Sequence, residues 1–513
     1  MIRIIALALL AASPIAVAGE ATRANEVAWL AAATDADIER AFAQARTERK
    51  PLLLYWGAKW CPPCNQLKAT LFNRQDFIER SRSFVAVGVD GDLPGAQALG
   101  ALFKVIGYPT MILFTPSGAE ITRLPGEADA AQVMDVLALG LASGRPIHAV
   151  LADARSGKPL SANEWRMLAF YSWETDEQQL VAQSGRSQLL ASLAAACRSD
   201  DPEIATRLWL KALAANEDGK GPRPDAALKE RVRGVLASPA AARLQMDVLS
   251  NGAATIVKTL APRIGRDRRS LVASFDAALT RLQADRTLSR ADRFGALLAR
   301  VDLARFEQPK DDPRPKLPPA LLEEVRENAR SADREITDGY ERQAVITTAA
   351  HVLGRAGLWH ESDNLLKGNL AKSHSPYYLM SQLAGNARTR GDKPGALRWY
   401  AEAFKASEGP ATRLQWGASY LAALVDLAPK DALRIEQTAS QILTEAAAQS
   451  NPFQQRSARS LRRVGEKLAS WNKRGVHRAV IQRLQNHLDP LCARLATAEV
   501  QRAACEGLLK PAA

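Results

Sequence analysis

The pattern of hydrophobic and polar residues divides the chain into two parts. Over residues 35–143, short continuous apolar runs alternate with segments of helical spacing. After residue 146 the spacing is helical throughout, and β-branched runs are almost absent. Strands that alternate with helices predict an α/β domain with part of its sheet parallel, whereas helical spacing alone predicts an all-α region.

Turn residues and apolar runs locate the elements expected in the first part, which we predict to form one α/β domain over residues 19–145. Strands are predicted at residues 52–56, 84–89, 110–114 and 120–124, the last two flanking a Pro-Ser-Gly-Ala turn. Helices are predicted at residues 36–50, 61–81, 94–104 and 129–141.

Proline-rich segments divide the all-α part. We predict a helical region at residues 146–308, a proline-rich linker at 309–319 and a second helical region at 320–513. In the second region, Gly357 and Gly391 are 34 residues apart, a period that resembles the tetratricopeptide helix pair. Only about two units match this pattern, so an irregular helical bundle is the alternative.

The N-terminus has the pattern of a cleaved secretory signal. Arg3 precedes an apolar run at residues 4–12, and Ala16-Val17-Ala18 provides a small-x-small cleavage site. The run is shorter than the roughly 20 residues that a membrane-spanning helix needs. We therefore expect residues 1–18 to be removed and the protein to be exported to an oxidising compartment, the bacterial periplasm.

The charge of the chain lies in its helical part. The formal net charge is +13, yet residues 19–145 hold 13 basic and 14 acidic side chains. Arg456, Arg459, Arg463 and Lys467 recur at three- and four-residue spacing and therefore share one helix face. We expect a solvated face; contact with anionic lipid or an acidic partner is the alternative. Export makes nucleic acid an improbable partner.

Candidate chemistry is concentrated in Trp60-Cys61-Pro62-Pro63-Cys64, which follows a predicted strand and opens a predicted helix. A zinc site would need a second pair of ligands, and the sequence has no such pair at suitable spacing, so no metal is expected. A purely structural disulfide would close too short a loop to stabilise much. A redox-active dithiol is therefore the favoured interpretation, and this chemistry needs no cofactor.

The position of the dithiol assigns a role to each cysteine. At a helix N-terminus the macrodipole and free N–H groups favour the thiolate, so Cys61 is the expected nucleophile. Cys64, one turn later, is the expected resolving residue. Pro62 and Pro63 have no N–H to donate to the Cys61 sulfur, which leaves the Cys64 N–H. We therefore expect a moderately lowered Cys61 pKa and a reducing couple.

The dithiol motif, together with Gly107-Tyr108-Pro109-Thr110 entering a later strand, resembles the thioredoxin superfamily over roughly residues 27–143. Lys50-Pro51-Leu52 and Thr70-Leu71-Phe72 add a similarity to the C-terminal domain of the DsbD electron transporter. The resemblance implies a thioredoxin fold and a cis bond between Tyr108 and Pro109. It also implies a client-docking surface, made of Trp60, Pro62, Pro63, Tyr108 and Pro109.

Three positions depart from the thioredoxin pattern. Tyr55 stands where the strand before the dithiol usually carries an acid, residues 84–89 contain no lysine to partner that acid, and Ala69 replaces a helix proline. The first two departures leave open which group deprotonates Cys64.

The other three cysteines lie in the helical part. Cys492 and Cys505 are too far apart for a disulfide within one straight helix, but a turn near residues 496–497 would bring them together. We expect a structural disulfide there and an inert, buried Cys197.

Together these features predict an exported thiol:disulfide oxidoreductase, with protein disulfides as clients and helices that hold a partner. A reductase in an oxidising compartment would need a membrane electron donor. Two alternatives remain at this stage: a disulfide oxidase or isomerase, and an interaction scaffold in which the dithiol is secondary.

Overall fold

The structure, a computed structural model, describes residues 26–510 except 178, 198–201, 218, 220, 310–311 and 496–498. The expected signal at residues 1–18 and the turn expected near residues 496–497 therefore lie outside the described residues. The α/β domain comprises β1 (Leu30–Ala31), α2 (Asp35–Glu48), β2 (Leu52–Gly57), α3 (Pro62–Thr70), α4 (Gln75–Ser81), β3 (Val85–Asp90), α5 (Ala96–Leu102), β4 (Thr110–Phe114), β5 (Glu120–Leu124) and α6 (Ala130–Ser143).

The five strands form one mixed sheet in the order β1-β3-β2-β4-β5. β3 pairs parallel with β1 and β2, and β4 pairs antiparallel with β2 and β5. The predicted α/β fold with a partly parallel sheet is confirmed. The two-residue strand β1 was not predicted, because so short a segment has no recognisable pattern.

Helices cover both faces of the sheet, so every residue of β2 is buried. Because side chains alternate along a strand, Leu52 and Leu54 pack with α2 and α5 on one face. Leu53 and Tyr55 belong to the core on the opposite face, which includes α3 and α6. The second core continues into the first helices of the all-α part, so the two parts share one apolar interior.

The single helix predicted at residues 61–81 is wrong, because the chain turns between α3 and α4. In one continuous helix, Phe72 and Phe77 would point roughly 140° apart. The turn brings their rings to 5.3 Å between centroids, and both side chains are buried. Burial of two aromatic rings against the sheet thus outweighs continuation of the helix.

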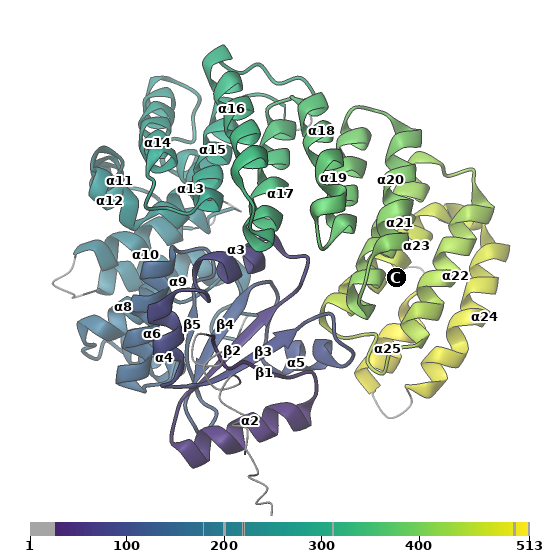
Figure 1. The fold of residues 1–513 in the computed structure, drawn as a ribbon, viewed down its shortest axis with the longest axis horizontal. Helices are drawn as coiled ribbons and strands as arrows, with labels where there is room; N and C mark the ends of the chain where they lie inside the picture. The colour runs from purple at the N-terminus through teal and green to yellow at the C-terminus, as the bar shows by residue number, and fades with distance from the viewer. Residues whose placement is uncertain are drawn as a thin grey trace, which may run out of the picture.

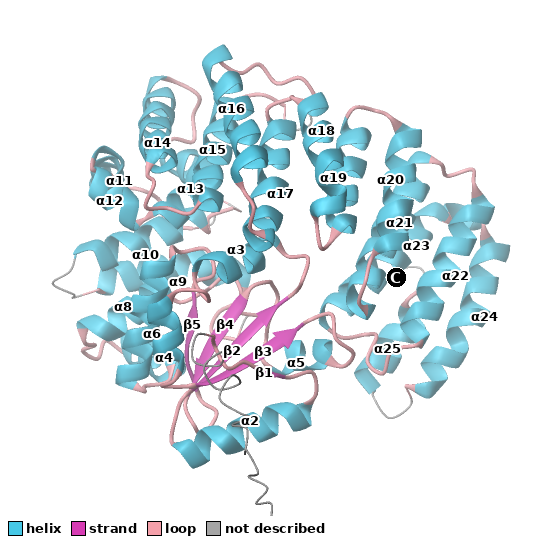
Figure 2. Ribbon diagram, viewed as in Figure 1, coloured by secondary structure: helices cyan, strands magenta, loops and turns pink. Residues whose placement is uncertain are grey.

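The remainder of the described chain is helical, as predicted, and curves around the α/β domain (Figures 1 and 2). Its helices are α7 (Ile147–Arg155), α8 (Ala162–Phe170), α9 (Arg186–Ala196), α10 (Pro202–Ala214), α11 (Ala226–Ala237), α12 (Pro239–Leu244), α13 (Met246–Leu260), α14 (Arg266–Ala284), α15 (Arg290–Ala304), α16 (Pro319–Glu335), α17 (Gly339–Arg355), α18 (Trp359–Asn369), α19 (Pro376–Thr389), α20 (Lys393–Ala406), α21 (Pro410–Leu427), α22 (Ala432–Ala447), α23 (Gln455–Trp471), α24 (Arg478–Arg494) and α25 (Glu499–Gly507). Each helix of the described residues is too short or too polar to span a lipid bilayer.

Two consecutive helix pairs, α17–α18 and α19–α20, turn at equivalent glycines. Gly357 and Gly391 adopt left-handed φ values of 78° and 82°, which residues with a Cβ rarely adopt. At each turn the residue after the glycine donates its N–H to a carbonyl five residues earlier, a Schellman motif. The 34-residue spacing therefore corresponds to two similar helix hairpins, while the tetratricopeptide assignment itself stays a prediction.

A disulfide joins Cys492 on α24 to Cys505 on α25, with the two Cα atoms 5.5 Å apart. Cross-linking two points of the unfolded chain lowers its entropy, and a loop of this size corresponds to about 3 kcal/mol. We expect the Cys492→Ser, Cys505→Ser variant to lose about 2–3 kcal/mol of unfolding free energy in urea denaturation. An unchanged urea midpoint would show that this cross-link contributes nothing to stability.

Candidate active site

The dithiol lies where β2 passes into α3. Cys61 is the N-cap of α3, Pro62 and Pro63 occupy its first positions, and Cys61 and Cys64 are joined in a disulfide. The Cys64 N–H donates to Cys61 Sγ at 3.2 Å, as the sequence predicted. This geometry places the Cys61 sulfur at the positive end of the helix, where a thiolate is stabilised.

The Tyr108–Pro109 peptide bond is cis, in the segment that enters β4. The Trp60 and Tyr108 rings meet edge to face, with centroids 5.8 Å apart. Tyr108 also stacks on Trp56 of β2. The structure therefore brings together two motifs that are far apart in the sequence, with Trp60 and Tyr108 as their contact.

A cavity of about 240 Å³ borders the cis proline. One wall is formed by Tyr108, Pro109 and the β5–α6 turn, and the other by residues of α10 and α13. Glu127 lies in this cavity and accepts a hydrogen bond from Asn251 at 2.7 Å, although part of its side chain faces solvent. Desolvation, reinforced by the charges of Glu174 and Asp247, raises the pKa of Glu127 to about 7.

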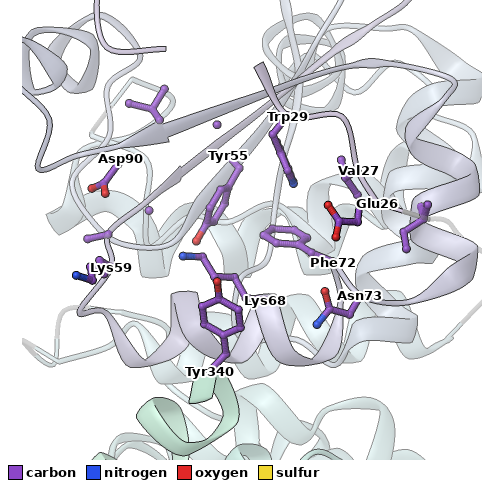
Figure 3. A pocket seen from close by; sticks show the side chains of 15 residues that line it. Glu26, Val27, Trp29, Tyr55, Lys59, Lys68, Phe72, Asn73, Asp90 and Tyr340 are labelled. Carbon is purple, nitrogen blue, oxygen red and sulfur yellow. The ribbon is translucent and has the colours of Figure 1, made fainter. Parts of the chain in front are cut away.

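A larger cavity of about 650 Å³ lies beside α3, where Tyr55 replaces the expected acid (Figure 3). The Tyr55 hydroxyl is buried with no hydrogen-bond partner among the described residues, and in Figure 3 it faces the polar ends of Lys68 and Tyr340. Desolvation raises the pKa of Asp90 and lowers the pKa of Lys68, both of which line this cavity. Lys68 lies on α3 and Asp90 at the end of β3, two positions that the sequence motifs did not single out.

The dithiol is covered by the helical part of the chain. Cys61 is 2% exposed and Cys64 is fully buried. Gln343 of α17 donates to the backbone carbonyl of Trp60 at 3.4 Å, and His374 Nε2 lies 3.0 Å from the carbonyl of Lys59. Protein atoms from the helical part therefore lie against the backbone that immediately precedes the dithiol.

The expected solvated face of α23 is wrong at Arg456, which is buried against the α/β domain. Its guanidinium forms an ion pair with Asp92 and lies 5.2 Å from the ring centroids of both Trp60 and Tyr108. Further along α23, Lys467 pairs with Asp426 of α21 at 2.8 Å. Arg459 and Arg463 are exposed, as expected, and Lys467 is partly exposed, so Arg456 is the member of the stripe that departs from a solvated face.

Comparisons with known proteins agree with this geometry. The sequence model of the family described as "Thioredoxin-like domain" matches residues 38–140. A thioredoxin from Mycolicibacterium smegmatis is 31% identical over 85 residues, which cover 73% of that protein and 17% of this chain. The chain belongs to the thioredoxin superfamily. No solved structure matches it significantly.

The other thioredoxin-superfamily relatives are larger proteins. Thiol:disulfide interchange protein DsbD 1 of Pseudomonas aeruginosa is 29% identical over 113 residues, which are 21% of this chain and 19% of that protein. DsbD of Klebsiella pneumoniae is 30% identical over 100 residues, 19% of this chain and 16% of that protein. The chain thus spans less than a fifth of the length of these relatives.

Proposed function

We propose that the chain is an exported thiol:disulfide oxidoreductase that reduces disulfides in client proteins. The observation that carries this proposal is the Cys61–Cys64 pair at the N-terminus of α3, next to the cis Tyr108–Pro109 bond. Export rests on the sequence pattern of residues 1–18 alone.

In the proposed reaction, the Cys61 thiolate attacks one sulfur of a client disulfide and expels the other client sulfur as a thiolate. The Cys64 thiolate then attacks the Cys61 sulfur and releases the second client sulfur. The products are a dithiol client and the Cys61–Cys64 disulfide, so two electrons pass from the protein to the client. Trp60, Tyr108 and the prolines of both motifs would form the docking surface.

The direction of exchange follows from how weakly the thiolate is stabilised. Because Pro62 and Pro63 have no N–H groups, the Cys64 N–H is the donor to Cys61 Sγ from the first turn. A thiolate that is stabilised only moderately leaves the disulfide form favoured, which makes the couple a reductant. In an oxidising compartment, a membrane electron donor would have to regenerate the dithiol.

A disulfide oxidase or isomerase would use the same residues at a higher potential. An interaction scaffold is a candidate of another class, and the burial of Cys61 beneath the helices is the observation that favours it. In both cases the helical region would bind the partner.

The Cys64→Ser variant tests the exchange reaction. Without the resolving sulfur, Cys61 is expected to remain bound to clients in mixed disulfides that dithiothreitol releases. These adducts are measured on non-reducing gels of cells that express the full chain. The Cys61→Ser, Cys64→Ser variant is the control and should form none. Equal patterns from both variants would contradict the proposal.

A further inference from the structure

Three helices contribute the side chains that surround Trp60, the residue before Cys61; α19, α21 and α23 are called the cover below. Tyr378 of α19 stacks on the Trp60 ring at 5.8 Å with an interplanar angle of 17°. Trp416 of α21 meets the same ring edge to face at 5.3 Å. With Arg456 of α23 also over the ring, the cover encloses the side chain that adjoins the nucleophile.

One polar cluster joins the cover to the α/β domain. Asp92 accepts hydrogen bonds from Arg456, from Trp60 Nε1 at 2.9 Å and from the Thr412 hydroxyl at 2.6 Å. The backbone N–H of Arg456 donates to Gln97 of α5 at 2.9 Å. Asp92, Thr412 and Arg456 are all buried, so this cluster is shielded from solvent and salt.

The Arg456 guanidinium is incompletely paired in this position. Its Nε and Nη1 atoms are buried and have no hydrogen-bond partner among the described residues. Buried donors without partners carry a desolvation cost, which offsets part of the attraction to Asp92. The geometry of the contact is therefore specific, but its net stabilisation is smaller than that of an ion pair in which every buried donor is hydrogen-bonded.

We propose that the cover is an autoinhibitory lid over the dithiol, and that the buried Arg456–Asp92 pair with Thr412 is its latch. In the closed arrangement the cover, together with α17, leaves Cys61 only 2% exposed and out of reach of a folded client. Release of the latch frees the Trp60 side chain and Tyr108 beside it and thereby widens access to Cys61. Inhibition by the lid rests on the proposed oxidoreductase function. The lid itself concerns only whether a molecule outside the protein can reach the Cys61 thiol. A client that brings its own cation or aromatic ring to Trp60 and Asp92 would compete directly with the cover.

The lid is tested by the rate at which Cys61 is alkylated in the full chain after reduction with a phosphine. The reagent is a maleimide carried on a long polyethylene glycol chain, and labelling at Cys61 is quantified by peptide mass spectrometry. Because truncating one member of a buried pair leaves the other uncompensated, Arg456→Gln should accelerate labelling by about tenfold or more. Arg462→Gln changes an exposed residue of the same helix and is the matched control, expected to label at the native rate.

Thr412→Val keeps the side-chain volume and removes the hydroxyl contacts, so it provides a second test if Arg456→Gln does not fold. It should also accelerate labelling, while Arg456→Lys, which keeps the cation, should restore much of the protection. Native-rate labelling in a folded Arg456→Gln or Thr412→Val variant would overturn the lid. Labelling of Cys61 needs neither a client nor attack by Cys64, so it tests the lid alone. If Cys64→Ser captured no clients, the proposed function would be contradicted, but the labelling rates would still decide whether the lid exists.

Discussion

Replacing Cys61 by serine is expected to abolish disulfide reduction by the full chain, lowering its rate by roughly a thousandfold or more. The reason is chemical: the thiolate is the attacking species, and a serine hydroxyl at the same N-cap position stays protonated at neutral pH. The measurement is the rate at which a disulfide-bonded protein substrate is reduced, with dithiothreitol as the electron source.

Cys197→Ser is the control for this substitution. Cys197 lies at the C-terminal end of α9, where it is partly exposed rather than buried as expected, and it takes part in neither disulfide. Its loss should therefore leave the rate unchanged. If Cys61→Ser retained the native rate, the dithiol would not be the reactive group and the scaffold interpretation would be favoured.

The Asp247→Ala variant is expected to lose about 3–5 kcal/mol of unfolding free energy. Asp247 receives two hydrogen bonds from the fully buried Arg207, at 2.9 and 2.5 Å, and the Arg207 guanidinium lies 3.9 Å from the Phe170 ring centroid. Removing the carboxylate leaves a buried cation without its counter-charge, which costs far more than the contact itself is worth. Urea denaturation measures the loss.

The same pair has a defined pH dependence. Burial acts to raise the pKa of Asp247, but the charge and hydrogen bonds of Arg207 outweigh burial and hold the pKa below its usual value. The stabilisation is therefore present above the ordinary carboxyl pKa and is lost as the pH falls through the lowered value. The native protein and Asp247→Ala should accordingly converge in stability at strongly acidic pH.

An exposed pair provides the control for Asp247. Glu323 pairs with Arg330 at 2.7 Å on the surface of α16, with both side chains more than half exposed. Glu323→Ala should cost no more than about 1 kcal/mol, because solvent screens the interaction. If Asp247→Ala also lost no more than about 1 kcal/mol, Arg207 would have found another partner in the variant.

The α/β domain was largely predictable from its sequence, because its strands are continuous apolar runs and its dithiol opens a helix. The turn at residues 71–74 was not predictable. Local helical spacing continues through it, and the burial of Phe72 and Phe77 that breaks it depends on tertiary packing. The helical part was predictable as all-α, because each amphipathic segment has helical periodicity. The packing of these helices against one another was not predictable, because local periodicity does not identify a helix's neighbours.

The surroundings of the dithiol illustrate the same limit. Cys61, Cys64 and the cis proline follow from short motifs. Arg456 looks like one residue of a basic helix face until the fold brings it to Asp92, 364 positions earlier in the chain. Nothing in local spacing distinguishes a cation that faces water from one that pairs across two domains, so the cover was visible only in the structure.

The reduction potential of the Cys61–Cys64 pair tests the central claim most directly. The full chain is equilibrated with redox buffers of defined potential, and the fraction of reduced Cys61 is read by peptide mass spectrometry. A proline-flanked, weakly stabilised thiolate predicts a value near that of thioredoxin, about −270 mV. A value near −120 mV would contradict the account, because a couple so oxidising would donate disulfides to clients instead of reducing them.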